Sequence, residues 1–144
     1  MAIAPRHIKA RMFRDYLIEE NMLKSFGEHE VETGILFAGT FILGEDKRQF
    51  IIPIDDTPYT NVQFVIADEV PKDKRTQALE LMNTLNLQFP LIKYSIAKTN
   101  QFIASFVFHG DEKDFNAERL VMNVFQVCQN INLYQYKDIK EVIG

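Results

Sequence analysis

The sequence predicts an α+β fold in which helices pack on a mostly antiparallel sheet of five strands. Side chains alternate as in strands over residues 31–43, 49–54 and 62–67, and again over 92–97 and 101–109. Apolar residues recur at helical spacing before, between and after these two groups of strands. The expected order is therefore α-β-β-β-α-β-β-α. Pro53 has no N–H to donate to a ladder, so the second strand is expected to lie at an edge or to end there.

Three helices follow from the apolar periodicity. They are expected over Pro5–Leu23, Pro71–Phe89 and Phe115–Ile131, with Asp114 or Asn116 as the cap of the last one. Their apolar stripes are Ile8, Met12, Phe13, Tyr16, Leu17 and Leu23 in the first helix, Ala78, Leu81, Met82 and Leu85 in the second, and Ala117, Leu120, Val121, Val124, Phe125, Cys128 and Ile131 in the last. Residues 132–143 are expected to continue as helix after a kink.

Size and composition indicate a single domain over residues 1–144 and exclude several classes. With 47% hydrophobic and 25% charged residues, disorder, collagen and coiled coil are excluded. A net charge of −4 argues against a dedicated nucleic-acid surface, which needs clustered Lys and Arg. The N-terminus is charged where a signal peptide is apolar, and no apolar run reaches the roughly 20 residues that span a bilayer. We therefore expect a cytoplasmic protein with no membrane or nucleic-acid partner.

The alternation of side chains gives the sheet two apolar faces of different composition. One face is rich in rings, namely Phe37, Phe41, Phe50, Phe64, Phe102, Phe106 and Phe108. The other is aliphatic, with Leu36, Ala38, Ile42, Ile51, Val65, Ile103 and Val107. We expect the helices on the ring-rich face, because rings fill the roughly 10 Å gap between packed layers. The aliphatic face must then meet the remaining helix or a second protein, which makes self-association a hypothesis.

No residue of the chain is predicted to be catalytic or to bind a cofactor. Asn83 and Asn86 project into or beside the apolar arc of the second helix, where a buried amide must be hydrogen-bonded. We expect each to tie the helix to a strand end or a loop, and the alternative is that they recognise a ligand together with Tyr94. Cys128 projects into the apolar stripe of the last helix and is expected to act as a small hydrophobe.

Metal binding and acid–base catalysis find no support in the spacing of the ionisable residues. His7, His29 and His109 have no metal-ligand spacing, and there is no second cysteine. The acidic pairs Asp55–Asp56 and Asp68–Glu69 are best interpreted as solvated loop residues. Phosphate-binding loops, nucleophile elbows and zinc motifs are absent from the sequence. We therefore expect no enzyme activity, cofactor or metal.

One stretch of sequence resembles a known family. The helix Ala78-Leu-Glu-Leu-Met-Asn83-Thr-Leu-Asn86, the segment Ile92-Lys-Tyr94-Ser-Ile96, the strand Phe102-Ile-Ala-Ser-Phe106 and the apolar helix from Phe115 carry the resemblance. Together they resemble the YbjN-like domain family, described as bacterial sensory transduction regulators. The resemblance implies the type III secretion-chaperone fold, which is commonly dimeric and non-enzymatic. It also implies a regulatory or chaperone-like role in binding proteins, and it carries over no catalytic residue.

The sequence thus predicts a non-enzymatic protein-interaction module. Its expected partners are a second copy, in a homodimer, and another polypeptide. Two alternatives remain open. One is a small-ligand binder or minor enzyme with a pocket near Asn83, Asn86 and Tyr94. The other is a structural subunit of a phage or secretion assembly.

Overall fold

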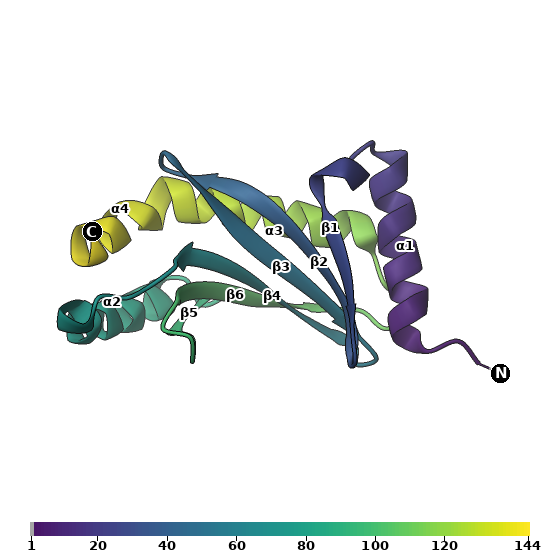
Figure 1. The fold of residues 1–144 in the computed structure, drawn as a ribbon, viewed down its shortest axis with the longest axis horizontal. Coiled ribbons are helices and arrows are strands. Elements are labelled where there is room, and N and C mark those ends of the chain that lie inside the picture. The colour runs from purple at the N-terminus through teal and green to yellow at the C-terminus, as the bar shows by residue number, and fades with distance from the viewer. Residues whose placement is uncertain (1) are drawn as a thin grey trace.

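The computed structural model describes residues 2–144 and has the predicted α+β architecture, with one strand more than expected (Figure 1). The elements are α1 (Pro5–Glu19), β1 (Gly27–Val31), β2 (Gly34–Leu43), β3 (Asp46–Asp55), β4 (Tyr59–Ala67), α2 (Arg75–Gln88), β5 (Lys93–Ile96), β6 (Phe102–His109), α3 (Ala117–Asn130) and α4 (Tyr136–Ile143). Short 3₁₀ turns at Leu23–Ser25 and Lys72–Lys74 follow α1 and precede α2. A π-helical segment, Ile131–Gln135, connects α3 to α4.

The strands form one open antiparallel sheet of six strands in the order β1-β2-β3-β4-β6-β5. The strand that the sequence did not predict is β1, which forms a hairpin with β2 through the pairs from Gly27↔Ala38 to Val31↔Gly34. All its side chains are exposed, and Glu28, His29 and Glu30 occupy its centre. A charged edge strand of this kind lacks the apolar alternation by which strands are found, and its charges protect the edge from pairing.

The prediction for Pro53 was wrong in one respect. β3 is an inner strand, and its ladder with β2 continues past Leu36↔Pro53 to Gly34↔Asp55. The ladder between β3 and β4 is short, because its only registered pairs are Phe50↔Phe64 and Ile51↔Gln63. Pro53 lies just beyond this ladder, and it has no N–H to offer.

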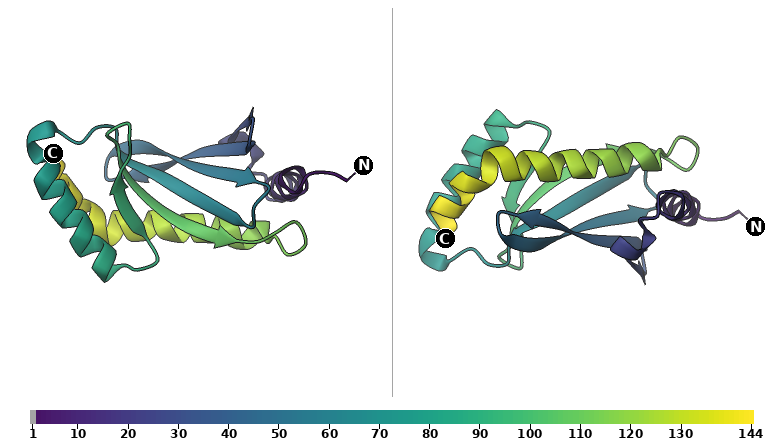
Figure 2. Two further views of the ribbon diagram at one scale, coloured as in Figure 1. Left: turned by 90° about the horizontal axis from the view of Figure 1, so that it is seen from below. Right: turned by 90° about the horizontal axis from the view of Figure 1, so that it is seen from above.

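The ring-rich face lies inside, as predicted. Phe37, Phe50, Phe64 and Phe102 are fully buried, while Phe106 is half-buried. Phe64 lies at the centre, with ring centroids 6.1 Å from Phe50 and 6.0 Å from Phe106. The helix α3 runs along this face, whereas α1 lies at one end of the sheet and α2 and α4 at the other (Figures 1 and 2).

The buried stripe of α1 differs from the predicted one. Its buried residues are Lys9, Ala10, Phe13 and Leu17. Ile8, Met12 and Tyr16 are only half-buried, and Leu23 lies outside the helix, because α1 ends at Glu19 and Asn21 adopts a left-handed φ of 56°. Phe13 packs edge-on against Phe37, at 4.7 Å between ring centroids, and this contact fixes the stripe. The helix is therefore rotated by about one residue from the expected orientation.

The last helix begins and bends as the sequence predicted. Asn116 caps α3 by accepting a hydrogen bond from the N–H of Arg119 at 3.0 Å. Leu120, Val121 and Val124 are buried, but Phe125 is 49% exposed, so its place in the buried stripe was wrong. The kink is the π-helical segment, and its residue Asn132 accepts a hydrogen bond through Oδ1 from the N–H of Gly44 in the β2–β3 turn.

The outer face of the sheet carries the predicted aliphatic side chains. Ile42 and Val107 are more than half exposed, and the other members of the set (Leu36, Ala38, Ile51, Val65 and Ile103) are half-buried. We call this set of seven residues the outer face. The strands β4, β6 and β5 lie in front of α3 in the left view of Figure 2, with no helix over them.

Candidate functional site

The two asparagines of α2 have different roles in the structure. Asn86 is half-buried, and its amide reaches the backbone of Tyr94 in β5. Its Nδ2 donates to the carbonyl of Tyr94 at 3.1 Å, while the N–H of Tyr94 donates to its Oδ1 at 2.6 Å. The side chain therefore closes the edge of β5 as a neighbouring strand would, which is the tie to a strand that the sequence predicted. Asn83 is exposed on α2, so the expectation that it too is partly buried and ties the helix to a strand end or a loop was wrong.

The pocket proposed around Asn83, Asn86 and Tyr94 would need polar groups that are free to meet a ligand. The donor and acceptor of the Asn86 amide are both engaged by Tyr94, and Asn83 points outward. The hydroxyl of Tyr94 is buried without a hydrogen-bond partner among residues 2–144, and burial raises its pKa. A ligand at this place would have to displace β5 from α2, so the geometry does not favour this alternative.

The remaining candidate residues of the sequence lie apart from one another. Cys128 is half-buried against the core, and burial raises the pKa of its thiol to about 12, so little reactive thiolate forms at neutral pH. Within residues 2–144, no three His, Cys, Asp or Glu side chains gather closely enough to hold a metal ion. His109 stacks edge-on against Tyr59, with ring centroids 4.9 Å apart, on the neighbouring strand.

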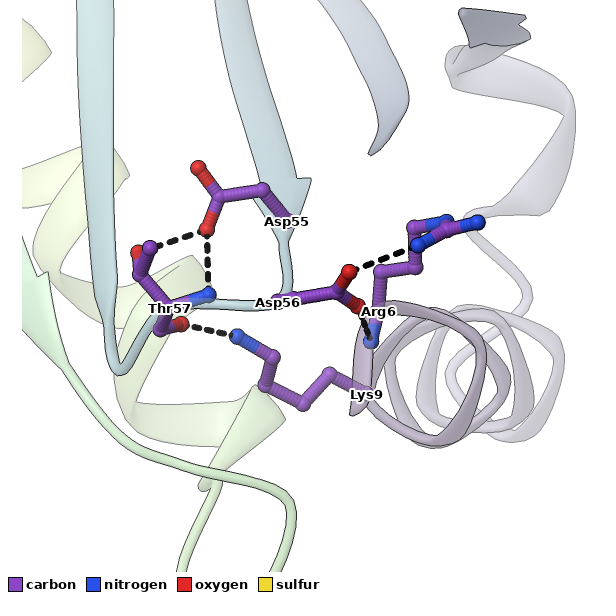
Figure 3. A network of polar contacts seen from close by, with 5 residues as sticks. All are labelled: Arg6, Lys9, Asp55, Asp56 and Thr57. Carbon is purple, nitrogen blue, oxygen red and sulfur yellow. Dashed lines mark hydrogen bonds and ion pairs between the residues drawn. The ribbon is translucent and has the colours of Figure 1, made fainter. Parts of the chain in front are cut away.

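A polar cluster that the sequence did not indicate joins α1 to the β3–β4 loop (Figure 3). Arg6 makes a 2.6 Å ion pair with Asp56 and also donates its backbone N–H to the same carboxylate at 3.0 Å. Asp55 accepts hydrogen bonds from the N–H of Thr57 at 2.9 Å and from its hydroxyl at 2.6 Å. Lys9 donates from its buried amine to the carbonyl of Thr57 at 2.5 Å. The cluster fixes the loop against the first turns of the helix.

Lys9 is the unexpected member of this cluster, because lysine is rarely buried without a carboxylate partner. Desolvation lowers its pKa from the ordinary value, although the nearby acids Asp55, Asp56, Asp111 and Glu112 favour the charged form. The amine faces a backbone carbonyl of the loop, and we find its role to be structural. Sequence periodicity could not find it, since a lysine within an apolar stripe looks like a solvated residue.

A hollow lies between the start of β3 and α4, with a volume of about 200 Å³. Its lining includes Arg48, which pairs with Asp68 at 3.2 Å and with Asp46 at 3.7 Å. Tyr136 donates from its hydroxyl to Asp46 at 3.3 Å. The lining holds the acids Asp46, Asp68 and Glu69 against the bases Arg48 and Lys140. It therefore carries a small excess of negative charge, which opposes the binding of an anion.

The outer face is the candidate surface that the alternation of side chains predicted. On the same side of the sheet, Thr40, Gln49, Gln63 and Ser105 lie between the aliphatic residues, and Lys47 and Asp55 lie near the two ends of β3. The accessible surface of the chain is 8993 Å². A compact monomer of 16.8 kDa is expected to expose about 7,700 Å². The chain therefore exposes roughly 1,300 Å² more than a compact monomer does, which exceeds the roughly 800 Å² that each partner buries in a standard interface.

No helix among residues 2–144 has the length and apolar character needed to cross a bilayer. Comparison of the chain with protein-family models finds no match. Comparison with curated proteins finds none either.

Proposed function

We propose that this chain is a non-enzymatic protein-interaction module that self-associates and binds another polypeptide, in a regulatory or chaperone-like role. The observation that carries the proposal is the outer face, which is aliphatic across neighbouring strands and has no helix over it. Apolar patches of this kind mark interaction sites when they are larger than a few hundred Å². The excess of accessible surface over that of a compact monomer supports the same proposal.

Self-association is the part that can be tested first. We expect the mass of the chain, measured by sedimentation equilibrium or light scattering at micromolar concentration, to be that of a dimer. A single-chain mass throughout this range would contradict the proposal. Binding of another polypeptide is a separate property of the chain, and the result for self-association does not decide it.

A matched pair of isoleucines tests whether the outer face is the surface involved. Ile42 is 58% exposed on the outer face, and Ile18 is 55% exposed on α1. Glutamate at an exposed position should leave the fold intact in both variants. We expect Ile42→Glu to raise the dimer dissociation constant by about tenfold or more, since it introduces a charge that pairing must bury. Ile18→Glu should leave the constant unchanged, and equal effects of the two variants would exclude the outer face.

A further inference from the structure

The edge of β6 is only partly paired. On one side its ladder with β4 runs as far as Tyr59↔His109, whereas on the other its ladder with β5 stops at Lys93↔Ser105. The four residues Phe106–His109 therefore have a strand neighbour on one side only among residues 2–144. A strand edge of this kind presents backbone N–H and C=O groups that can pair with another extended chain.

The other edges of the sheet are protected, and this edge is not. The β5 edge is closed at Tyr94 by the amide of Asn86. The β1 edge carries Glu28 and Glu30, and charged side chains oppose the addition of a further strand. The free part of β6 carries Phe106, Val107 and Phe108. Charged residues and proline, the usual protection of an edge, do not occur in Phe106–His109 apart from the terminal histidine.

A hollow lies on each side of this free edge. The first, of about 250 Å³, lies between Phe106 and the α3 residues Asn123, Gln126, Val127 and Asn130. The second, of about 450 Å³, lies toward the outer face and is lined by Asn61, Lys93 and Ser105. Leu91, Phe106 and Val107 border both hollows, so the edge forms the ridge between them.

This arrangement matches the geometry of one added strand. Successive side chains of a strand point to opposite faces of the sheet, so the side chains of an added strand would enter the two hollows alternately. The free edge accommodates about four residues, or about 13 Å of extended chain. Leu91, which is 86% exposed, lines both hollows, and α3 lines the hollow on the ring-rich side. The four free residues of the edge match the length of one short extended segment.

We infer that the free edge of β6 binds an extended segment of another polypeptide as a seventh strand. The inference rests on the proposed function and names the site and the chemistry of its partner. The segment presents apolar side chains to the hollow beside α3, where Phe106 and Val127 lie. It presents polar or acidic side chains to the outer hollow, where Lys93 is the lining residue with a charge. Backbone hydrogen bonds supply the affinity. The two hollows, which receive alternate side chains of the segment, determine which side chains are preferred.

The test uses the full chain and a random library of eight-residue peptides displayed on phage. We expect enriched peptides to alternate apolar residues with polar or acidic ones, and to bind the purified chain as blocked synthetic peptides. Amide hydrogen exchange of the complex should slow at alternate residues of Phe106–His109, because only every second N–H of a strand points to its free edge. Failure to enrich any peptide in repeated selections would overturn the inference.

Two controls distinguish pairing of the peptide with β6 from non-specific binding of the peptide to the chain. Leu91→Arg alters the edge site, and Leu87→Arg makes the same change at a 77% exposed leucine of α2 outside both hollows. We expect the first variant to weaken binding of the selected peptide by about tenfold and the second to leave it unchanged. Methylation of alternate amide nitrogens of the peptide, on the side that faces β6, should also weaken binding by about tenfold.

Equal binding of the selected peptide to the two leucine variants, or full binding of the methylated peptide, would overturn the inference. The mass of the chain in solution is measured independently and should be the same in Leu91→Arg as in the parent chain. If the chain is a dimer but selects no peptide, the β6 site is rejected and the proposed self-association is retained. If the chain is a monomer and the leucine variants and the methylated peptide behave as expected, only the self-association is rejected.

Discussion

The ring-rich face and the outer face belong to the same strands but differ in what they contact. On the ring-rich face, helices and neighbouring rings bury Phe37, Phe50 and Phe64 completely. On the outer face, the equally apolar Ile51 and Val65 are half-buried by their strand neighbours alone, and Ile42 is mostly exposed. The difference shows that hydrophobicity alone does not mark the core. The ring-rich face forms the core, and the outer face is the side of the sheet that stays accessible.

The largest expected effect separates the two faces within a single strand. Ile52 is fully buried on the ring-rich face, and its neighbour Ile51 is half-buried on the outer face. We expect Ile52→Ala to lower the free energy of unfolding by about 3 kcal/mol and Ile51→Ala by about 1 kcal/mol, because only the first leaves a cavity in a closed core. Urea denaturation measures the loss in both variants, at protein concentrations low enough to keep the chain monomeric. Equal losses would contradict the distinction between the faces.

The closed β5 edge should contribute less than the core. Asn86→Ala removes both hydrogen bonds to Tyr94 and leaves its backbone N–H and carbonyl without these partners. We expect a loss of about 2 kcal/mol in the free energy of unfolding. Asn83→Ala, at an exposed position on the same helix, should change it by less than about 0.5 kcal/mol. A similar small effect for both would show that Asn86 does not hold the edge.

A buried amide near the end of the chain should reduce stability slightly. Gln135 is 1% exposed, and neither Nε2 nor Oε1 has a hydrogen-bond partner among residues 2–144. We expect Gln135→Leu to raise the free energy of unfolding by about 1 kcal/mol, because the desolvation of the amide is removed while its volume is largely kept. Thermal unfolding measures the change, with the exposed Gln129→Leu as the control. Destabilisation would imply that an ordered water satisfies the amide.

The smallest effect concerns the edge at β1, where the ring-rich face ends in an ion pair. Arg14 donates two hydrogen bonds to Glu28, at 2.9 and 2.8 Å, and these lower the pKa of the Glu28 carboxyl. The pair therefore stabilises the fold above the ordinary carboxyl pKa, and this contribution is lost as pH falls through the lowered value. Because both side chains are more than a third exposed, we expect less than about 1 kcal/mol.

Glu28→Gln should remove this part of the pH dependence of unfolding between neutral and acid pH. Added salt should weaken the contribution in the parent chain, since exposed pairs are screened. A pH profile identical in the parent and in Glu28→Gln would show that the pair does not contribute to stability.

The sequence was sufficient to predict the two faces, because alternation along β2, β3 and β6 depends only on the geometry of a strand. The Asn116 cap and the tie made by Asn86 were also predictable, since each follows from a local rule. The position of Lys9 was not, because the packing of Phe13 against Phe37 decides which side of α1 turns inward. That contact joins residues far apart in the chain, and helical periodicity contains no information about it.

The strand β1 and the free edge of β6 were missed for a related reason. Gly27–Val31 is charged and exposed, so it becomes a strand only because β2 offers an edge to pair with. The free edge exists because β5 begins at Lys93, after Pro90 and Leu91, while β6 continues to His109. The sequence indicates where each strand lies but not how two strands pair. An edge is left unpaired where one strand extends beyond its neighbour, so it cannot be predicted from either strand alone.

The short ladder between β3 and β4 has a mechanical consequence. Between β3 and β4 the registered pairs are Phe50↔Phe64 and Ile51↔Gln63, and the loop from Asp55 to Tyr59 joins the two strands covalently. Across this junction the ring of Phe64 meets that of Phe41 edge-on and that of Phe50 at a tilt. Contacts between rings are less directional than a hydrogen-bonded ladder. Rotation of β3 relative to β4 is therefore opposed by the packing of these rings as well as by backbone hydrogen bonds.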